Sequence, residues 1–183
     1  MTIFEKNQKW SFYKGGNNLR TPSDIITDKI FEIANLVLTR IIKPDIELKN
    51  VRELDIETIE RLKKEYGIEA IILDVDETLR KNLNEIPKCN QEWIEEVKKH
   101  IKVIVVTNGL EAKAEQYFKE QDIEYIGLAF KPLKRGFIKA CKSLNVKPEN
   151  VLVVGDDLWD DIHGGQKNKM KTALVKDVEE EER

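Results

Sequence analysis

The sequence predicts an α/β protein in which a central parallel sheet is covered by helices on both faces. Three short apolar runs, at residues 71–73, 103–106 and 151–154, do not alternate between apolar and polar residues. Such continuous runs of Val, Ile and Leu are typical of parallel strands that are buried on both faces. Segments with a helical spacing of apolar residues separate the runs, as in repeated strand–helix units. We therefore expect a three-layer, Rossmann-like fold.

Length and composition agree with one domain of this class. The chain has 183 residues, of which 40% are hydrophobic and 36% are charged. None of its apolar runs approaches the roughly 18 residues of a membrane-spanning helix, and we find no signal peptide. The two cysteines, Cys89 and Cys141, lack the spacing of a zinc site or of a disulfide framework. We expect a cytoplasmic protein, or one that is peripheral at the inner face of a membrane.

Residues 1–43 are predicted to form an amino-terminal extension with an amphipathic helix at residues 21–43. Thr21 suits the N-cap position of this helix, and Pro44 disfavours helical geometry in the residue before it. The apolar residues of the helix form a wide stripe: Ile25, Ile26, Ile30, Phe31, Ile33, Leu36, Val37, Leu38, Ile41 and Ile42. We expect the stripe to pack on the following domain or on a second copy of the chain, which would give a homo-oligomer. The alternative is peripheral contact with a membrane surface, where amphipathic helices lie.

The extension is also the basic part of the chain. It carries seven basic and four acidic side chains, a net charge of +3, whereas the whole chain has a net charge of −3. The basic residues are scattered and do not form the continuous stripe, with interleaved aromatic residues, that nucleic-acid-binding modules carry. We expect no nucleic-acid partner.

The domain at residues 44–176 is predicted to alternate strands and helices before an acidic tail at residues 177–183. It begins with a short strand or extended connector at residues 46–51 and a helix at residues 55–66, which Gly67 closes as its C-cap. After the strand at 71–73, the expected elements are, in order, a helix at 87–100, a strand at 103–106, a helix at 111–121, a strand at 123–126, a helix at 136–144, a strand at 151–154 and a strand at 172–175.

Polar residues that suit phosphoryl transfer follow the predicted strands. Asp74 and Asp76 come after the first apolar run, and residues two apart on an extended chain point the same way. Thr107 and Asn108 follow the next apolar run, and Asp156 follows a later one. The carboxyl ends of parallel strands form one edge of a sheet, where α/β proteins bind ligands. We therefore expect these side chains to converge there.

With Lys131 added, the order of these groups resembles the haloacid dehalogenase (HAD) superfamily, whose phosphatases use an aspartate nucleophile. Its four motifs correspond, in chain order, to Asp74-x-Asp76-x-Thr78, to Thr107, to Lys131, and to Gly155-Asp156 with Asp161. A closer resemblance, over residues 42–176, is to the YqeG-type phosphatases of subfamily IIIA, which are related to phosphatidylglycerophosphate phosphatases. It is carried by Lys43-Pro44-Asp45 followed by residues 51–59, by residues 129–137, and by residues 154–161 with Gly164-Gly165. The sequence departs from that pattern at Asp157, Asp160 and Lys169, and the last is a position where glycine is usual.

The resemblance implies a covalent mechanism. Asp74 would attack the phosphorus atom to give an aspartyl-phosphate, while Asp76 would protonate the leaving alcohol and later take a proton from water. Thr107, Asn108 and Lys131 would bind the substrate phosphate.

Magnesium is the expected cofactor, because hard oxygen ligands without a His or Cys cluster favour it. Its ligands would be the side chains of Asp74 and Asp156 and the backbone carbonyl of Asp76, with Asp161 as a supporting acid. Trp159 is expected to pack. Four further cations are candidates for gathering an anionic substrate: Arg80, Lys81, Lys134 and Arg135.

The expected site has no lid. The intervals 79–106 and 108–130 are already filled by the expected helices and strands, so no cap domain fits. A site without a lid admits a bulky phosphomonoester such as a phospholipid headgroup, and the expected reaction converts phosphatidylglycerophosphate to phosphatidylglycerol. One alternative is a soluble HAD phosphatase for a sugar phosphate, a nucleotide phosphate or a phosphoprotein. A second alternative is a non-catalytic module that binds phosphate and magnesium.

Overall fold

The computed structural model of the protein describes residues 29, 37, 41–81 and 84–178. The chain divides into two compact units, Met1–Ile41 and Ile42–Arg183, and the sheet lies in the second unit. Most of the predicted helix at residues 21–43, and most of the predicted tail at residues 177–183, lie outside the described residues.

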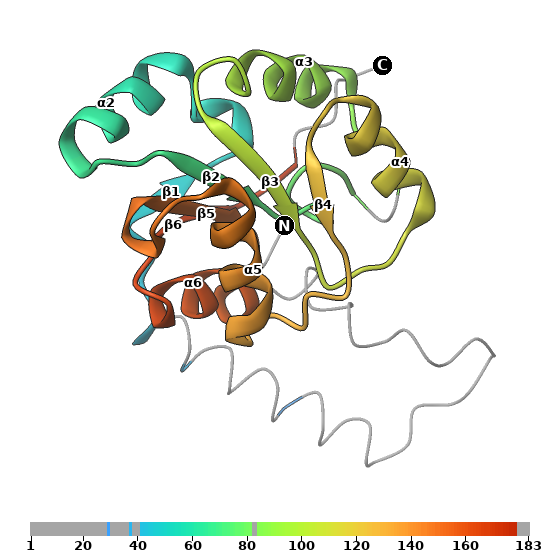
Figure 1. Ribbon diagram of the computed structural model, residues 1–183. Coiled ribbons are helices and arrows are strands. Elements are labelled where there is room, and N and C mark those ends of the chain that lie inside the picture. Colours follow the sequence, from blue (N-terminus) through green and yellow to red (C-terminus); the bar gives the residue numbers. More distant parts are fainter. Residues whose placement is uncertain (1–28, 30–36, 38–40, 82–83, 179–183) are drawn as a thin grey trace. The chain divides into compact units, whose positions relative to one another are not determined.

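The second unit is built on a six-stranded sheet in the order β1-β6-β5-β2-β3-β4 (Figure 1). The strands are β1 (Ile46–Leu48), β2 (Ala70–Leu73), β3 (Lys102–Val106), β4 (Glu124–Ile126), β5 (Val151–Gly155) and β6 (Lys171–Val175). Each pair of neighbouring strands is parallel. The predicted central parallel sheet is therefore confirmed.

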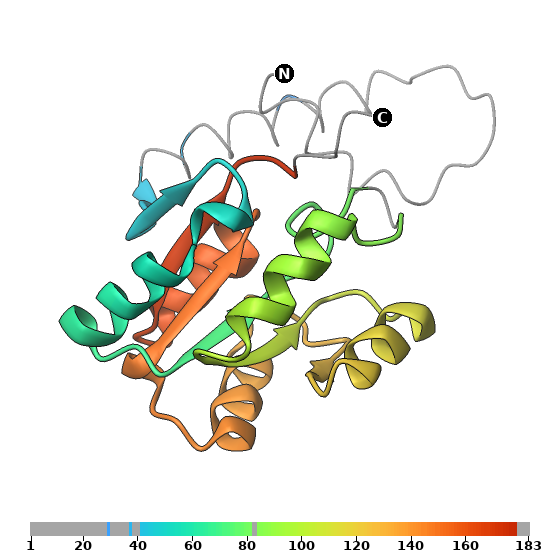
Figure 2. The same ribbon diagram turned by 90° about the horizontal axis from the view of Figure 1, so that it is seen from above.

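Helices cover both faces of this sheet and give the predicted three layers. One face carries α2 (Ile56–Tyr66), α3 (Lys88–Val97) and α4 (Ala112–Glu120), and Figure 2 shows α2 and α3 lying over the strands. The other face carries α5 (Lys134–Leu144) and α6 (Gly164–Lys167). The shorter helical segments are the 3-10 turns η2 (Val51–Glu53) and η3 (Pro148–Asn150) and the π-helix η4 (Leu158–His163).

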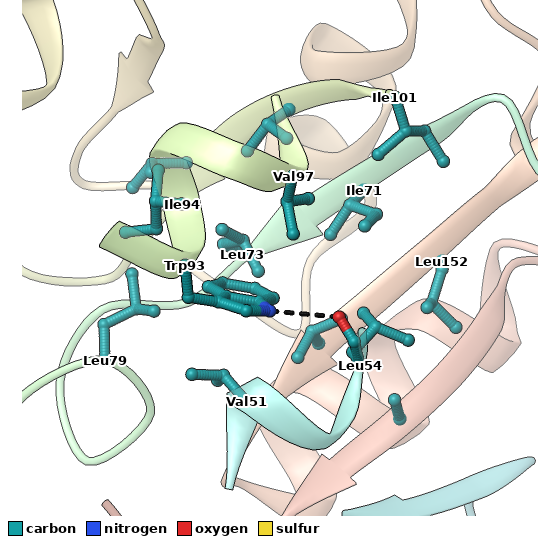
Figure 3. Packing of buried hydrophobic residues seen from close by; sticks show 14 of the residues in the cluster. Val51, Leu54, Ile71, Leu73, Leu79, Trp93, Ile94, Val97, Ile101 and Leu152 are labelled. Carbon is teal, nitrogen blue, oxygen red and sulfur yellow. Dashed lines mark hydrogen bonds between the residues drawn. The ribbon is translucent and has the colours of Figure 1, made fainter. Parts of the chain in front are cut away.

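Two apolar clusters, one on each face of the sheet, account for the uninterrupted apolar strands. Ile71 belongs to the cluster beneath α2, α3 and α4, whereas its neighbour Ile72 belongs to the cluster beneath α5. Successive side chains of a strand point to opposite faces, so both faces of β2 must be apolar. In the larger cluster, Trp93 lies among aliphatic side chains, and its Nε1 donates a hydrogen bond of 3.0 Å to the carbonyl oxygen of Leu54 (Figure 3).

Most predicted elements are present, with small shifts at their ends. The side chain of Asp55 accepts a hydrogen bond from the backbone N–H of Thr58 at 2.8 Å, and Gly67 ends α2 with a φ of 66°. The predicted helix at residues 87–100 ends at Val97, and β1 is shorter than the predicted strand. The segments η4 and α6 are additional to the elements that the sequence predicts.

Within the described residues, the connection from β2 to β3 contains α3 as its helix, and the connection from β3 to β4 contains α4. Neither connection holds an inserted cap domain in that part of the chain, as the sequence predicted. None of the helices that the structure describes is both long enough and apolar enough to cross a membrane.

Candidate active site

The predicted site residues lie at the carboxyl end of the sheet, where the strand order changes direction. From β2 the chain continues to β3 and β4 on one side, and it then returns to β5 on the other side of β2. Ligands of open α/β sheets bind at such a switch point. Asp74 directly follows β2 and Asp156 directly follows β5. The backbone N–H of Asp74 donates to the carbonyl oxygen of Val154 at 2.9 Å, which keeps the two strand ends together.

Asp74, Lys131, Asp156 and Asp161 form a group that we call the Asp74 cluster. Nζ of Lys131 lies 2.7 Å from Oδ1 of Asp74 and 2.6 Å from Oδ1 of Asp161. The exposed fractions of these three residues are 7%, 5% and 1%, respectively. Carboxylate oxygens of the three aspartates all lie within 4.8 Å of one another. The fold thus brings together four residues that the sequence analysis singled out.

The charges of the Asp74 cluster do not balance. Burial alone would lower the pKa of Lys131, but the carboxylates of Asp161 and Asp74 raise it. Burial raises the pKa of Asp161 well above its ordinary value, and the effect of Asp74 and Asp156 opposes that of Lys131. Three buried or partly buried carboxylates face one ammonium group, so a divalent cation would supply the missing positive charge. An oxygen-only ligand set of this kind fits magnesium.

Gly155 allows Asp161 to approach the end of β5. A Cβ atom on Gly155 would overlap with Cγ of Asp161 and lie 2.7 Å from its Cβ. Asp161 is part of η4, whose N-cap Asp157 accepts hydrogen bonds from the backbone N–H groups of Trp159 and Asp160, each at 2.8 Å. The spacing of the fourth motif therefore has a steric cause, because η4 folds Asp161 back against a glycine.

Asp76, Arg80 and Glu111 form a second group, which we call the Asp76 cluster. Nε of Arg80 donates to Oδ1 of Asp76 at 3.0 Å, and its Nη2 pairs with Glu111. Burial would lower the pKa of Arg80, but Glu111 and Asp76 raise it. The suggestion that Arg80 gathers substrate is wrong, because its exposed fraction is only 5% and its guanidinium binds the site's own carboxylates.

Asn108 holds the loop that carries Lys131. Its Oδ1 accepts from the backbone N–H of Lys131 at 2.6 Å, and its Nδ2 donates to the carbonyl oxygen of Lys131 at 3.1 Å and to Oδ2 of Asp160 at 2.8 Å. In the same loop the peptide bond from Lys131 to Pro132 is cis, and Phe130 has a φ of 55°. The sequence predicts that Asn108 binds the substrate phosphate. In this structure its amide positions Lys131, a role that sequence spacing did not reveal.

Two threonines place hydroxyl groups beside the clusters. Oγ1 of Thr107 accepts a hydrogen bond from the backbone N–H of Gly109 at 3.1 Å, and Oγ1 of Thr78 donates to Oδ1 of Asp156 at 3.2 Å. A Cβ atom on Gly109 would lie 3.3 Å from Oδ2 of Asp76 and 3.5 Å from Oγ1 of Thr107. The hydroxyl of Thr107 and the carboxylate of Asp76 therefore flank the same glycine.

Other residues from the sequence analysis lie outside both clusters. Lys81 pairs with Asp177 at 3.1 Å. Trp159 is expected to pack, and its ring stacks on that of His163 with centroids 4.5 Å apart, while 46% of its surface stays exposed. Lys169 has a φ of 65°, a backbone conformation that glycine adopts more readily than lysine.

Comparisons with known proteins agree with this geometry. Residues 44–168 match the family model of the haloacid dehalogenase-like hydrolases. A curated relative from Bacillus subtilis strain 168, named probable phosphatase YqeG, is 35% identical over 142 residues, which cover 76% of this chain and 80% of that protein. The glyceraldehyde 3-phosphate phosphatase of Pyrococcus furiosus is 28% identical over 130 residues, which cover 64% of this chain and 54% of that protein.

Solved structures share the fold at lower sequence identity. An uncharacterized protein from Listeria monocytogenes serotype 4b has a TM-score of 0.50 and 18% identity, over 63% of this chain and 84% of that chain. An uncharacterized protein from Corynebacterium glutamicum has a TM-score of 0.50 and 14% identity, over 60% of this chain and 86% of that chain. At these identities the similarity concerns the fold alone.

Proposed function

The chain belongs to the haloacid dehalogenase-like hydrolases, and from this premise we propose that it is a magnesium-dependent phosphatase that forms an aspartyl-phosphate on Asp74. The observation that carries the proposal is the Asp74 cluster, where Lys131 holds Asp74 beside two further carboxylates at the switch point of the sheet. Both curated relatives are named as phosphatases, which supports the reaction class.

In the first half of the proposed reaction, Asp74 is the nucleophile. A phosphate monoester repels a carboxylate, so the attack needs positive charge near the phosphoryl oxygens. Lys131 supplies one charge, and a magnesium ion held by Asp74, Asp156 and the backbone carbonyl of Asp76, with Asp161 as a supporting acid, would supply more. An oxygen of Asp74 bonds to phosphorus while the bond between phosphorus and the leaving oxygen breaks.

Asp76 serves as general acid and then as general base. It gives a proton to the leaving oxygen and later accepts one from the water molecule that attacks the phosphorus. The bond between phosphorus and Asp74 then breaks, and inorganic phosphate is released. The hydrogen bond from Arg80 fixes the direction of the Asp76 carboxylate. Thr107, beside the same glycine as Asp76, is placed to donate its hydroxyl to a phosphoryl oxygen.

We infer that the substrate is a lipid phosphomonoester, most specifically phosphatidylglycerophosphate. The observation that supports a bulky substrate is the absence of an inserted cap domain in the described residues between β2 and β4. The choice of a lipid follows from the resemblance of the sequence to YqeG-type phosphatases, a group that is related to phosphatidylglycerophosphate phosphatases. A site without a lid leaves room for a headgroup that stays attached to its membrane. Peripheral membrane contact through residues 21–43 remains a separate prediction.

The test is phosphate release from vesicles that contain phosphatidylglycerophosphate, beside a panel of soluble sugar and nucleotide phosphates. Wild type and Asp74→Asn are compared with magnesium and with a chelator. We expect selective turnover of the lipid, which is lost in the variant and in the chelator. Turnover confined to soluble esters would keep the mechanism and refute the lipid substrate. Absence of turnover on every ester would favour a non-catalytic module that binds phosphate and magnesium.

A second candidate substrate is a small soluble phosphate ester. The observation that favours it is the similarity to a relative named glyceraldehyde 3-phosphate phosphatase, although the match covers about half of that protein. A second copy of the chain would then complete the open site, and a dimer in solution together with high turnover of a triose phosphate would support this candidate.

A further inference from the structure

The exposed large apolar side chains of the second unit gather at one edge of the sheet. Among the described residues of Ile42–Arg183 they are Tyr66, Leu110, Leu128, Phe130, Leu133 and Trp159. All except Tyr66 lie in the segments that follow the carboxyl ends of β3, β4 and β5, at the edge where Asp74 lies. We call these five residues the apolar rim. Their exposed fractions run from 46% for Trp159 to 67% for Leu110.

Hydrogen bonds join the three segments that carry the apolar rim. The carbonyl oxygen of Gly109, next to Leu110, accepts from the backbone N–H of Leu128 at 3.1 Å. Asn108 donates to the carbonyl oxygen of Lys131, next to Phe130, and to the carboxylate of Asp160, next to Trp159. The rim residues are therefore attached to one cross-linked set of loops around the Asp74 cluster, and they are not scattered single exposures of the kind that need no explanation.

Basic residues adjoin the apolar rim in an unusual place. Lys134 and Arg135 are exposed and are the first two residues of α5, directly after Leu133. The first turn of α5 has no acidic residue, although the amino end of a helix favours acidic rather than basic side chains. Among the described residues, neither cation forms an ion pair. Two cations without ion-pair partners, next to exposed Leu and Phe side chains, complement a surface with an anionic outer layer and an apolar interior.

We propose that the apolar rim, with Lys134 and Arg135, docks the active-site edge onto an anionic membrane surface. The rim side chains enter the boundary between headgroups and acyl chains, while the two cations face lipid phosphates. Trp159 suits this position because an indole ring favours the interface between membrane and water. The phosphomonoester of a lipid then reaches Asp74 without leaving the bilayer. The inference rests on the proposed lipid substrate, whereas membrane docking itself is measured without any turnover.

The test is flotation of the full-length protein with vesicles of phosphatidylcholine that contain or lack phosphatidylglycerol. Two double variants remove the rim and the charge separately: Leu110→Ser with Leu133→Ser, and Lys134→Glu with Arg135→Glu. Matched controls are Tyr66→Ser and Lys64→Glu on α2, which are exposed at other places of the same unit. Turnover of p-nitrophenyl phosphate reports whether each variant keeps an intact site.

We expect each double variant to bind anionic vesicles at least about tenfold more weakly than wild type. One variant loses two apolar side chains that enter the membrane, and the other loses two cations that face lipid phosphates. Turnover of p-nitrophenyl phosphate by Leu110→Ser with Leu133→Ser should stay within about twofold of wild type, the charge variant should keep the melting temperature of wild type, and the controls should bind vesicles like wild type. The wild type could bind vesicles through the rim and yet fail to hydrolyse phosphatidylglycerophosphate. That result would support the docking surface and refute the proposal of a lipid substrate.

Two results would overturn the proposal. The first is vesicle binding that survives both double variants and is lost when apolar residues within 21–43 are changed to serine, which would assign membrane contact to the extension. The second is a rim variant that changes the oligomeric state or lowers the melting temperature while vesicle binding stays unchanged. That result would mean that protein, either a second copy or residues 1–41, covers the rim.

Discussion

The Asp74 and Asp76 clusters each pair buried carboxylates with a cation, but the cations differ. In both, one buried cation lies between two carboxylates beside the exit of β2. Lys131 comes from a distant loop and leaves an excess of negative charge among Asp74, Asp156 and Asp161. Arg80 lies four residues after Asp76 and pairs with that residue and Glu111. Two aspartates two residues apart thus receive different surroundings.

The difference between the two cations explains how Asp74 and Asp76, at the end of one strand, can have different roles. The ammonium of Lys131 is a compact charge that can be shared between the nucleophile and a phosphate. The guanidinium of Arg80 is a planar fork, which fixes the direction of the carboxylate that it binds. Carboxyl groups in contrasting environments are suited to separate tasks in catalysis. We therefore propose that Asp74 attacks the phosphorus atom and that Asp76 transfers the proton.

The substitution Asp74→Asn is expected to have the largest effect on turnover. It keeps the shape of the Asp74 cluster but removes the proposed nucleophile, so kcat should fall by about 10⁴-fold or more. Steady-state phosphate release measures this loss, and circular dichroism checks that the variant is folded. If Asp74→Asn retains a substantial part of the activity while Asp76→Asn has none, the assignment of the two roles is wrong.

The substitution Lys131→Met tests the Asp74 cluster by removing its cation. It leaves Asp74 and Asp161 buried without their partner, and breaking a buried ion pair costs about 3–5 kcal/mol. We expect a loss of this size in the free energy of unfolding without magnesium, measured in urea, together with a kcat reduced by about 10³-fold. Magnesium should restore part of the stability. A variant as stable as wild type in chelator would contradict the charge imbalance that we describe.

Alanine at Gly155 or at Gly109 tests the two clusters one at a time, because each added methyl group lies against a side chain of only one cluster. Gly155→Ala places a Cβ against Asp161, in a position that overlaps with the Asp161 side chain. Gly109→Ala places a Cβ 3.3 Å from Oδ2 of Asp76, which is a tight contact without overlap. We expect Gly155→Ala to weaken magnesium binding by about tenfold or more, since outer groups of a metal site tune affinity on that scale. Gly109→Ala should leave magnesium binding unchanged and lower kcat. Isothermal titration with magnesium distinguishes the two, and equal affinities would refute the steric argument.

The substitution Arg80→Lys tests whether the Asp76 cluster needs the planar guanidinium group or only its positive charge. A lysine keeps the positive charge but cannot bind Asp76 and Glu111 with the geometry of a guanidinium. We expect kcat to fall by about tenfold with little change in KM, because in the proposed mechanism Lys131 of the Asp74 cluster, and not Arg80, binds the substrate phosphate. Arg80→Gln, which removes the charge, should be worse. A larger effect on KM than on kcat would instead place Arg80 in substrate binding.

The smallest predicted effect concerns Asp160 at the border of the Asp74 cluster. Burial, with a contribution from Asp157, raises the pKa of Asp160 to about 6. A carboxyl group with a raised pKa binds its proton more tightly in the folded state, so its contribution to stability is present at low pH and is lost as pH rises from about 4 to about 6. In chelator, Asp160→Asn should lack this part of the pH dependence. Urea unfolding at several pH values would show it, and superimposable curves for the two proteins would exclude it.

The fold and the Asp74 cluster were largely predictable because their signals are local. Continuous apolar runs fix strands that are buried on both faces, and the motif order places Asp74, Lys131 and Asp156 at strand ends. The role of Arg80 was not predictable, because its burial depends on Glu111, which lies 31 positions away. The helix η4 was missed because it depends on the packing of Asp161 against Gly155 and not on an apolar pattern.

The most direct test of the division of roles is to trap the covalent intermediate. Asp76→Asn should still form the aspartyl-phosphate, but it lacks the base that activates water, so the intermediate should accumulate. After acid quenching of this variant with substrate and magnesium, we predict a phosphoryl group on the peptide that contains Asp74, and none on Asp74→Asn with Asp76→Asn. A phosphoryl group on another residue, or burst-free turnover without any adduct, would contradict the assignment of Asp74 as nucleophile.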